Sequence, residues 1–136
     1  MTLKIFTDGG SKGNPGPSAI GIVFYVNDKK IYDYREDIGI TTNNVAEYTA
    51  VIRALSKIKE DKTQFGTIDS IQFVSDSALL VNQLNGIFKI KKAHINELVL
   101  TIKSLVTEIA IPVSYTLVRR EQNTVADALV NNKSVA

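Results

Sequence analysis

Apolar and polar positions alternate along the first part of the chain in a way that predicts consecutive β-strands. We expect strands over residues 3–7, 18–26 and 31–38, separated by segments rich in Gly, Pro and polar residues. Short connections join neighbouring strands in antiparallel pairs. The N-terminal part is therefore predicted to form an antiparallel meander.

The period then changes to that of a helix and alternates with further strand patterns. The predicted elements, in the order helix, strand, helix, helix, strand, helix, cover residues 44–59, 71–75, 79–84, 95–109, 113–117 and 125–130. A strand, helix, strand succession favours parallel pairing. Strands one and four should therefore be parallel neighbours.

Composition limits the possible chemistry. The chain has 136 residues, 44% of them hydrophobic, which fits one domain over residues 1–136 and a single core, and hence a monomer. Cysteine is absent and His94 is the single histidine, which excludes thiolate and multi-histidine metal sites. Oxygen-liganded metals remain possible.

Charge and hydropathy add little about partners. The net charge is +2, which is too small to argue for nucleic acid by itself. The N-terminus lacks a signal-peptide pattern, and the longest apolar run, residues 19–26, is too short to span a bilayer. We expect a cytoplasmic protein without membrane contact.

Two predicted strands run directly into a carboxylate. Asp8 follows the first strand and precedes a Gly/Pro cluster that should end it, and Asp76 follows the fourth strand. Parallel pairing would bring both side chains to one sheet edge, where ligands gather in such folds. The alternatives are that Asp8 hydrogen-bonds into its turn and that Asp76 caps the next helix.

Two further acids lie on predicted helices. Glu47 follows a possible N-cap, Asn44, by three residues, which is the spacing of a capping box. A helix N-terminus also favours an ionised carboxylate that can bind a cation or position a water. Asp127 follows Asn123, a second expected N-cap, and either is a plain exposed acid or faces a cleft.

The densest positive cluster lies at residues 87–92, where apolar and basic residues alternate. Lys89, Lys91 and Lys92 form either a solvated rim or, if they border the site, a surface for a phosphate backbone. His94 begins the next helix and is interpreted as a capping or surface residue.

Four motifs occur in a fixed order. They are Asp-Gly-Gly-Ser-x-Gly-Asn-Pro-Gly from Asp8, Thr-Asn-Asn-x-Ala-Glu-Tyr from Thr42, Ser-Asp-Ser from Ser75, and Arg-Glu-x-Asn-x-x-Ala-Asp-x-Leu from Arg120. Together they resemble type 1 ribonuclease H (ribonuclease HI), and the resemblance covers nearly the whole chain. It implies an α/β ribonuclease H-like fold, with a five-stranded mixed sheet of antiparallel strands 1–3 and parallel strands 1, 4 and 5, flanked by helices on both sides.

The resemblance also implies an endoribonuclease that hydrolyses the RNA strand of RNA/DNA hybrids, leaving 5′-phosphate and 3′-hydroxyl ends. Two Mg²⁺ ions, with Mn²⁺ as an alternative, would be held by Asp8, Glu47, Asp76 and Asp127. By the same resemblance Asp8 bridges both ions and Asp127 helps to hold the ion that activates water. Glu47 and Asp76 hold the ion beside the leaving oxygen, and Glu47 also contacts the RNA 2′-hydroxyl.

The chemistry explains this set of residues. Phosphodiester cleavage develops negative charge on the attacking and leaving oxygens, and two ions roughly 4 Å apart stabilise both in an in-line displacement. Carboxylates are the hard ligands that Mg²⁺ prefers. Four crowded acids without metal would raise one another's pKa, which argues against a purely structural explanation.

Substrate contacts follow by the same matching. Asn14, Asn43 and Asn44 resemble minor-groove residues, and Thr42 resembles part of a DNA-phosphate pocket. Amides suit this role because they both donate and accept hydrogen bonds, and 2′-hydroxyl contacts distinguish RNA from DNA. The other expected substrate contacts are Gly9, Gly10, Lys12, Lys89, Lys91 and Lys92. Double-stranded RNA is a further duplex to test as a partner.

Departures from the family pattern define a compact branch. The loop histidine found in many members is replaced by Arg119-Arg120-Glu121-Gln122-Asn123, so Arg120 is expected to take the auxiliary catalytic role, with Glu121 second. The basic, Trp-bearing protrusion is missing, which predicts weaker or more salt-sensitive hybrid binding. Ala78 stands where Gln is frequent and removes one minor-groove contact.

Other functions remain as alternatives. The first is a module on the same fold that binds hybrid or double-stranded RNA without cutting it, but such a protein would have lost a catalytic carboxylate. Transposases, integrases and junction resolvases share the acids but not the segment from Thr42, and fold alone does not decide between them. A nucleotide hydrolase is disfavoured because there is no Walker-type phosphate loop.

Overall fold

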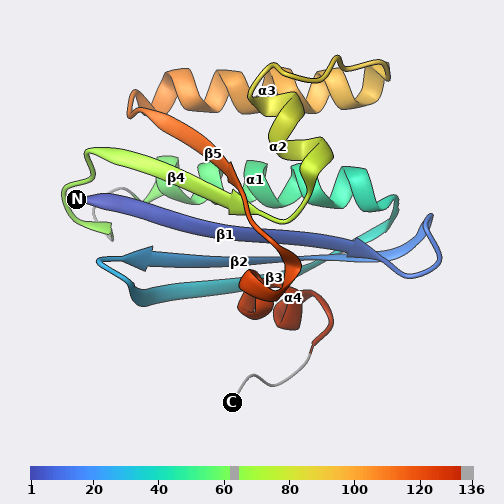
Figure 1. The fold of residues 1–136 in the computed structure, drawn as a ribbon, viewed down its shortest axis with the longest axis horizontal. Helices are drawn as coiled ribbons and strands as arrows, with labels where there is room; N and C mark the ends of the chain where they lie inside the picture. Colours follow the sequence, from blue (N-terminus) through green and yellow to red (C-terminus); the bar gives the residue numbers. More distant parts are fainter. Residues whose placement is uncertain (62–64, 133–136) are drawn as a thin grey trace.

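One five-stranded mixed sheet forms the centre of the molecule in the computed structural model, which describes residues 1–61 and 65–132 (Figure 1). The strands are β1 (Thr2–Ser11), β2 (Gly16–Val26), β3 (Lys29–Thr41), β4 (Ser70–Ser75) and β5 (Val113–Leu117). The helices are α1 (Asn43–Glu60), α2 (Ala78–Leu84), α3 (Ala93–Ile109) and α4 (Thr124–Val130), with a 3₁₀ turn, η2 (Arg120–Gln122), before α4.

The strand order is β3-β2-β1-β4-β5. β1, β2 and β3 are antiparallel neighbours, whereas β4 is parallel to both β1 and β5. The predicted mixed sheet and its parallel pairing are therefore confirmed. None of the described helices is long and apolar enough to cross a membrane.

Helices cover both faces of the sheet, as adjacent glycines in β1 demonstrate. A β-carbon on Gly9 would collide with the start of α1, whereas one on Gly10 would meet Val130 of α4. Because successive strand residues point to opposite faces, α1 and α4 lie on opposite sides of the sheet (Figure 1). The predicted arrangement of helices on both sides is confirmed.

The hydrophobic core lies between the sheet and the helices α1 and α3. Its largest fully buried side chains include Leu3, Ile5, Ile22, Phe24, Tyr48, Leu55, Phe73 and Ile102. Burying one such side chain contributes about 1.5–3 kcal/mol relative to leaving it exposed. The core thus supplies a rigid support for the strand ends that carry the acids.

Four strands are longer than their sequence pattern predicts, β2 and β4 by one or two residues and β1 and β3 by more. β1 continues through Gly9 and Gly10 to Ser11, so the prediction that the glycines end it after Asp8 is wrong. Pairing with β2 as far as Ser18 supplies the hydrogen bonds that keep this segment extended. β3 likewise covers residues 29–41 rather than 31–38.

The helix caps also differ from the prediction. Thr42, not Asn44, is the N-cap of α1, and its hydroxyl accepts from the Val45 N–H at 3.3 Å. Glu47 therefore lies beyond the first turn, and the capping-box interpretation is wrong. Ser77, not Asp76, caps α2 through a 3.2 Å bond from the Leu80 N–H. Neither Glu47 nor Asp76 therefore caps a helix.

The predictions for Asn123 and His94 have different outcomes. Asn123 does hold the N-cap position of α4, but its side chain does not cap the helix; its Nδ2 donates to the Thr7 carbonyl at 2.9 Å. His94 lies in the first turn of α3 and is exposed, and the N-cap residue there is Lys92. Between the predicted helix over residues 44–59 and the predicted strand over 71–75, the sequence also predicts a loop over residues 61–69, which lies partly outside the described residues.

Candidate active site

Asp8 lies just beyond the point where β1 stops pairing with β4. The parallel pairing of β1 with β4 ends at Phe6 and Val74, while β1 continues alongside β2 and pairs Asp8 with Gly21. Asp76 follows the last residue of β4, so both acids lie just beyond the last paired residues. The side chain of Asp8 is accordingly enclosed, and the residue is only 7% exposed.

Three carboxylates meet at this position. Oxygens of Asp8, Glu47 and Asp76 all lie within 4.8 Å of one another. The Oε2 atom of Glu47 is buried and makes no hydrogen bond among the described residues. A buried carboxylate oxygen without a partner is expensive, and a hard divalent cation would satisfy it. The donor set therefore fits a metal ion.

Burial and mutual repulsion shift the titration of this cluster. Burial, with the charges of Asp76 and Asp127, raises the pKa of Asp8 from 3.8 to about 7. Burial and the charge of Asp8 raise the pKa of Glu47 well above its usual value. Burial also raises the pKa of Asp76, although the neighbouring Arg120 opposes the rise. Without a cation, the cluster thus retains protons near neutral pH.

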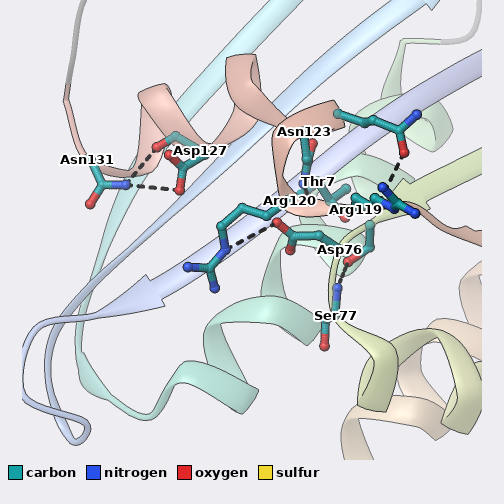
Figure 2. A network of polar contacts seen from close by, with 10 residues as sticks. Thr7, Asp76, Ser77, Arg119, Arg120, Asn123, Asp127 and Asn131 are labelled. Carbon is teal, nitrogen blue, oxygen red and sulfur yellow. Dashed lines mark hydrogen bonds and ion pairs between the residues drawn. The ribbon is translucent and has the colours of Figure 1, made fainter.

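Asp127 approaches the cluster from α4. It lines the same cleft, and its negative charge raises the pKa of both Asp8 and Asp76. Asn131 holds its carboxylate, because Asn131 Nδ2 donates to Oδ1 at 3.2 Å and to the Asp127 carbonyl at 2.9 Å (Figure 2). Asp127 stands outside the group of three but faces the cleft, so the plain exposed interpretation is wrong.

Arg120 is the cation beside the acids. Its Nε lies 3.9 Å from Asp76 Oδ2, and the arginine side chain is 86% exposed. Figure 2 shows it extending from the loop before α4 toward Asp76. Glu121 is exposed in the same turn. The structure thus places the Arg120 guanidinium beside Asp76 in the lining of the cleft, and its auxiliary catalytic role stays a prediction.

A cleft of about 480 Å³ joins these groups. The predicted site residues that line it are Asp8, Gly9, Gly10, Lys12, Asn43, Glu47, Asp76, Arg120 and Asp127. Arg35 and Asn131 also line it and were not singled out from the sequence. The strand pattern alone gave no signal for Arg35, because its bond to the Leu129 carbonyl joins it to the distant C-terminal helix.

The predicted amide residues lie together beside this cleft. A hollow of about 330 Å³ is lined by Asn14, Thr42, Asn43, Asn44, Lys92 and His94. Asn43 Oδ1 accepts from the Ser11 N–H at 2.7 Å, and the Asn43 N–H donates to Asn14 Oδ1 at 2.9 Å. These bonds tie the β1–β2 turn to the start of α1. Among the described residues, the side-chain nitrogens of Asn14, Asn43 and Asn44 have no hydrogen-bond partner, so they can donate to a ligand.

The basic cluster borders a third, more apolar hollow of about 510 Å³. Lys89, Lys91 and Lys92 line it together with Ile87 and Phe88, which are 68% and 47% exposed. Asn44 and Lys92 line both this hollow and the preceding one, so the two hollows are neighbours. The sequence analysis singled out the lysines but not Phe88. The signal that could have identified Phe88 is its position as an aromatic residue in a segment without helical periodicity.

Comparison with known proteins gives a consistent result. A family profile described as reverse transcriptase-like matches residues 6–133. The chain is 38% identical to LC11-RNase H1, crystallised in complex with an RNA/DNA hybrid. The alignment covers 96% of this chain and 95% of that one, with a TM-score of 0.87.

Curated relatives are longer than this chain. It is 34% identical to the bifunctional protein Rv2228c of Mycobacterium tuberculosis, over 97% of this chain and 35% of the relative. It is 39% identical to ribonuclease HI of Halobacterium salinarum, over 95% of this chain and 62% of the relative. The chain thus spans about a third of the first of these relatives and less than two thirds of the second.

Proposed function

This chain belongs to the reverse transcriptase-like family and to its type 1 ribonuclease H members, and from that membership we propose that it hydrolyses the RNA strand of RNA/DNA hybrids. The observation that supports the proposal best is the meeting of Asp8, Glu47 and Asp76 within 4.8 Å. The crystallised hybrid complex of the similar LC11-RNase H1 supports the choice of substrate.

We propose that Asp8, Glu47, Asp76 and Asp127 hold two Mg²⁺ ions, with Mn²⁺ as an alternative. The Oε2 atom of Glu47, which has no hydrogen-bond partner among the described residues, and the raised pKa of Asp8 both fit carboxylates that bind a cation. When bound, such ions activate water as a nucleophile and stabilise charge on the attacking and leaving oxygens. The expected products carry 5′-phosphate and 3′-hydroxyl ends.

The side chains around the acids have separate tasks in this proposal. The positive charge of Arg120 opposes the rise in the pKa of Asp76, and its exposed guanidinium offers donors to the scissile phosphate or to the product phosphate. Asn131 fixes the orientation of Asp127. Asp8 is buried at the centre of the four carboxylates, where bulk water has little access to it.

The hollows beside the cleft provide a path for the duplex. Thr42 accepts a bond from the Val45 N–H, so its hydroxyl proton remains able to donate to a phosphate oxygen. Lys89 and Lys92 supply positive charge along the continuation of this path. Preference for RNA at the cut strand would come from 2′-hydroxyl contacts by Glu47 and the neighbouring amides. We further propose that the protein acts as a monomer in the cytoplasm.

The deciding experiment is cleavage of an end-labelled RNA/DNA hybrid with Mg²⁺ or Mn²⁺, with double-stranded RNA and DNA run alongside. Wild type is compared with Asp76→Asn and with Asp33→Asn, which makes the same charge change at an exposed ion pair outside the cleft. Metal-dependent cutting that Asp76→Asn abolishes and Asp33→Asn retains would support the proposal. Hybrid binding without cutting in either ion would instead favour a binding module.

A further inference from the structure

Three residues lie in a row across neighbouring strands. Asp8 of β1 is directly opposite Gly21 of β2, and Gly21 is directly opposite Arg35 of β3. Directly opposed residues project to the same face of a sheet. Asp8 and Arg35 therefore stand on the face that α4 covers, with Gly21 between them.

The helix α4 crosses the sheet over this glycine. A β-carbon at Gly21 would lie 2.4 Å from the Ala126 carbonyl oxygen and 2.8 Å from Leu129 Cβ. Any larger residue would push the helix away from the sheet. The close contact places α4 between Asp8 on one side and Arg35 on the other.

Arg35 is bonded to the last turn of that helix. Its Nε donates to the Leu129 carbonyl at 2.7 Å, and this contact is partly buried. Its Nη1 also pairs with Asp37 Oδ1 at 3.0 Å, but Asp37 is 78% exposed, so this pair contributes little. A cation at a helix C-terminus interacts favourably with the helix dipole. The bond to Leu129 is thus the main link from Arg35 to the rest of the molecule.

The same short helix carries Asp127. Seven residues are too few to form a stable helix without tertiary contacts, so the position of α4 depends on its anchors. Asn123 attaches its start to the Thr7 carbonyl, and Arg35 attaches its end through Leu129. We propose that Arg35 is a positioning residue that fixes α4, and thereby the carboxylate of Asp127, relative to Asp8. This role rests on the proposed nuclease function.

Arg35→Met removes the donor while keeping an unbranched side chain of similar length. Arg53→Met is the matched control, because Arg53 pairs with Glu36 of β3 at 3.0 Å and loses the same charge away from α4. Arg35→Lys restores a cationic donor. The measurements are amide hydrogen exchange over residues 124–131 in metal-free protein, Mg²⁺ affinity, and kcat and KM on a hybrid.

We expect Arg35→Met to speed exchange in α4 and to lower both kcat and Mg²⁺ affinity roughly 10-fold with KM nearly unchanged, since a small misplacement of a catalytic group is costly. Arg35→Lys should recover part of each effect, and Arg53→Met should behave as wild type. A rise in KM alone would overturn the proposal, because it would identify Arg35 as a phosphate contact. Unchanged exchange, or faster exchange with unchanged kcat and Mg²⁺ affinity, would also overturn it. If wild type fails to cleave, the proposed function fails, while exchange and Mg²⁺ affinity still decide the role of Arg35.

Discussion

The backbone of Glu47 packs directly against Gly9. A β-carbon at Gly9 would lie 2.5 Å from the Glu47 nitrogen and 2.4 Å from the Ala46 carbonyl carbon. Atoms do not approach so closely in proteins, so α1 can begin this near to β1 only because residue 9 is glycine. The contact brings the Glu47 carboxylate from the helix to Asp8 on the adjacent strand position.

Gly9→Ala should therefore move the Glu47 carboxylate away from Asp8 and also destabilise the fold. The added methyl group meets backbone atoms that cannot rotate away, and such overpacking destabilises by roughly 1–3 kcal/mol or more. We expect loss of hybrid cleavage and of Mg²⁺ affinity at temperatures where the variant is still folded, as measured by circular dichroism and by metal titration.

Gly10→Ala is the matched control. The β-carbon there would meet Val130 Cγ1 at 3.1 Å, which is a side-chain atom that can shift. A smaller loss of stability is expected, with the contact between Asp8 and Glu47 preserved. Equal loss of metal affinity in both variants would contradict the role assigned to Gly9.

The raised pKa of Asp8 makes the stability of the metal-free protein depend on pH. Because the pKa is about 7 in the fold and 3.8 in its ordinary state, the folded protein binds more protons than the unfolded chain between these values. The stabilisation by this group is complete below the lower value and is lost as pH rises through about 7. Thermal unfolding in a chelator should show this fall, and Mg²⁺ should reverse it.

Asp8→Asn tests whether the Asp8 carboxylate causes this pH dependence of stability. A neutral amide neither repels Asp76 nor requires desolvation of a charge, so the metal-free variant should be more stable than wild type above pH 7. The expected difference is on the order of 2–4 kcal/mol, and it should disappear as the pH falls toward 4. A difference that does not change with pH would show that the carboxylate does not titrate as described.

Sequence periodicity was sufficient to predict the sheet and most of its elements. Burial of one face imposes a period of two on strands such as β4 and of 3.6 on helices such as α3, and both are visible without a structure. The acids at strand ends were also predictable, since parallel strands bring Asp8 and Asp76 to one edge.

Contacts between distant segments were not predictable in the same way. Thr42 and Asn44 are both good N-cap types, so local preference does not choose between them, whereas the structure has Thr42 as the N-cap. The bond from Arg35 to the Leu129 carbonyl joins residues far apart in the chain and has no local sequence signal. Such contacts depend on tertiary geometry, which propensity does not encode.

Arg120→Ala should move the acidic limb of the activity profile to higher pH. The Arg120 charge lowers the pKa of Asp76 and of Glu47, so its removal makes both carboxylates harder to ionise. We expect roughly 10-fold lower kcat near neutral pH, with partial recovery as pH rises. Kinetics over a range of pH values, with saturating Mg²⁺, would measure this.

Two further variants separate charge from geometry at this position. Arg120→Lys keeps the charge and should restore the position of the limb, although it loses the planar donor pair. Arg119→Ala removes the same charge from the adjacent residue and should leave the limb in place. A limb that shifts equally in Arg119→Ala and Arg120→Ala would mean that net charge, and not the pairing with Asp76, controls the titration.

The lysines at residues 89–92 should determine how strongly hybrid binding depends on salt. Each lysine that contacts a phosphate releases a counterion and adds about 0.9 to the slope of log affinity against log salt. Binding measured in the Asp76→Asn background, which should not cut, ought to show a slope reduced by about 1 in Lys89→Gln and in Lys92→Gln. Lys103→Gln, exposed on α3, is the control and should leave the slope unchanged. If all three variants share one slope, the basic cluster is a solvated rim, and the duplex follows another path from the cleft.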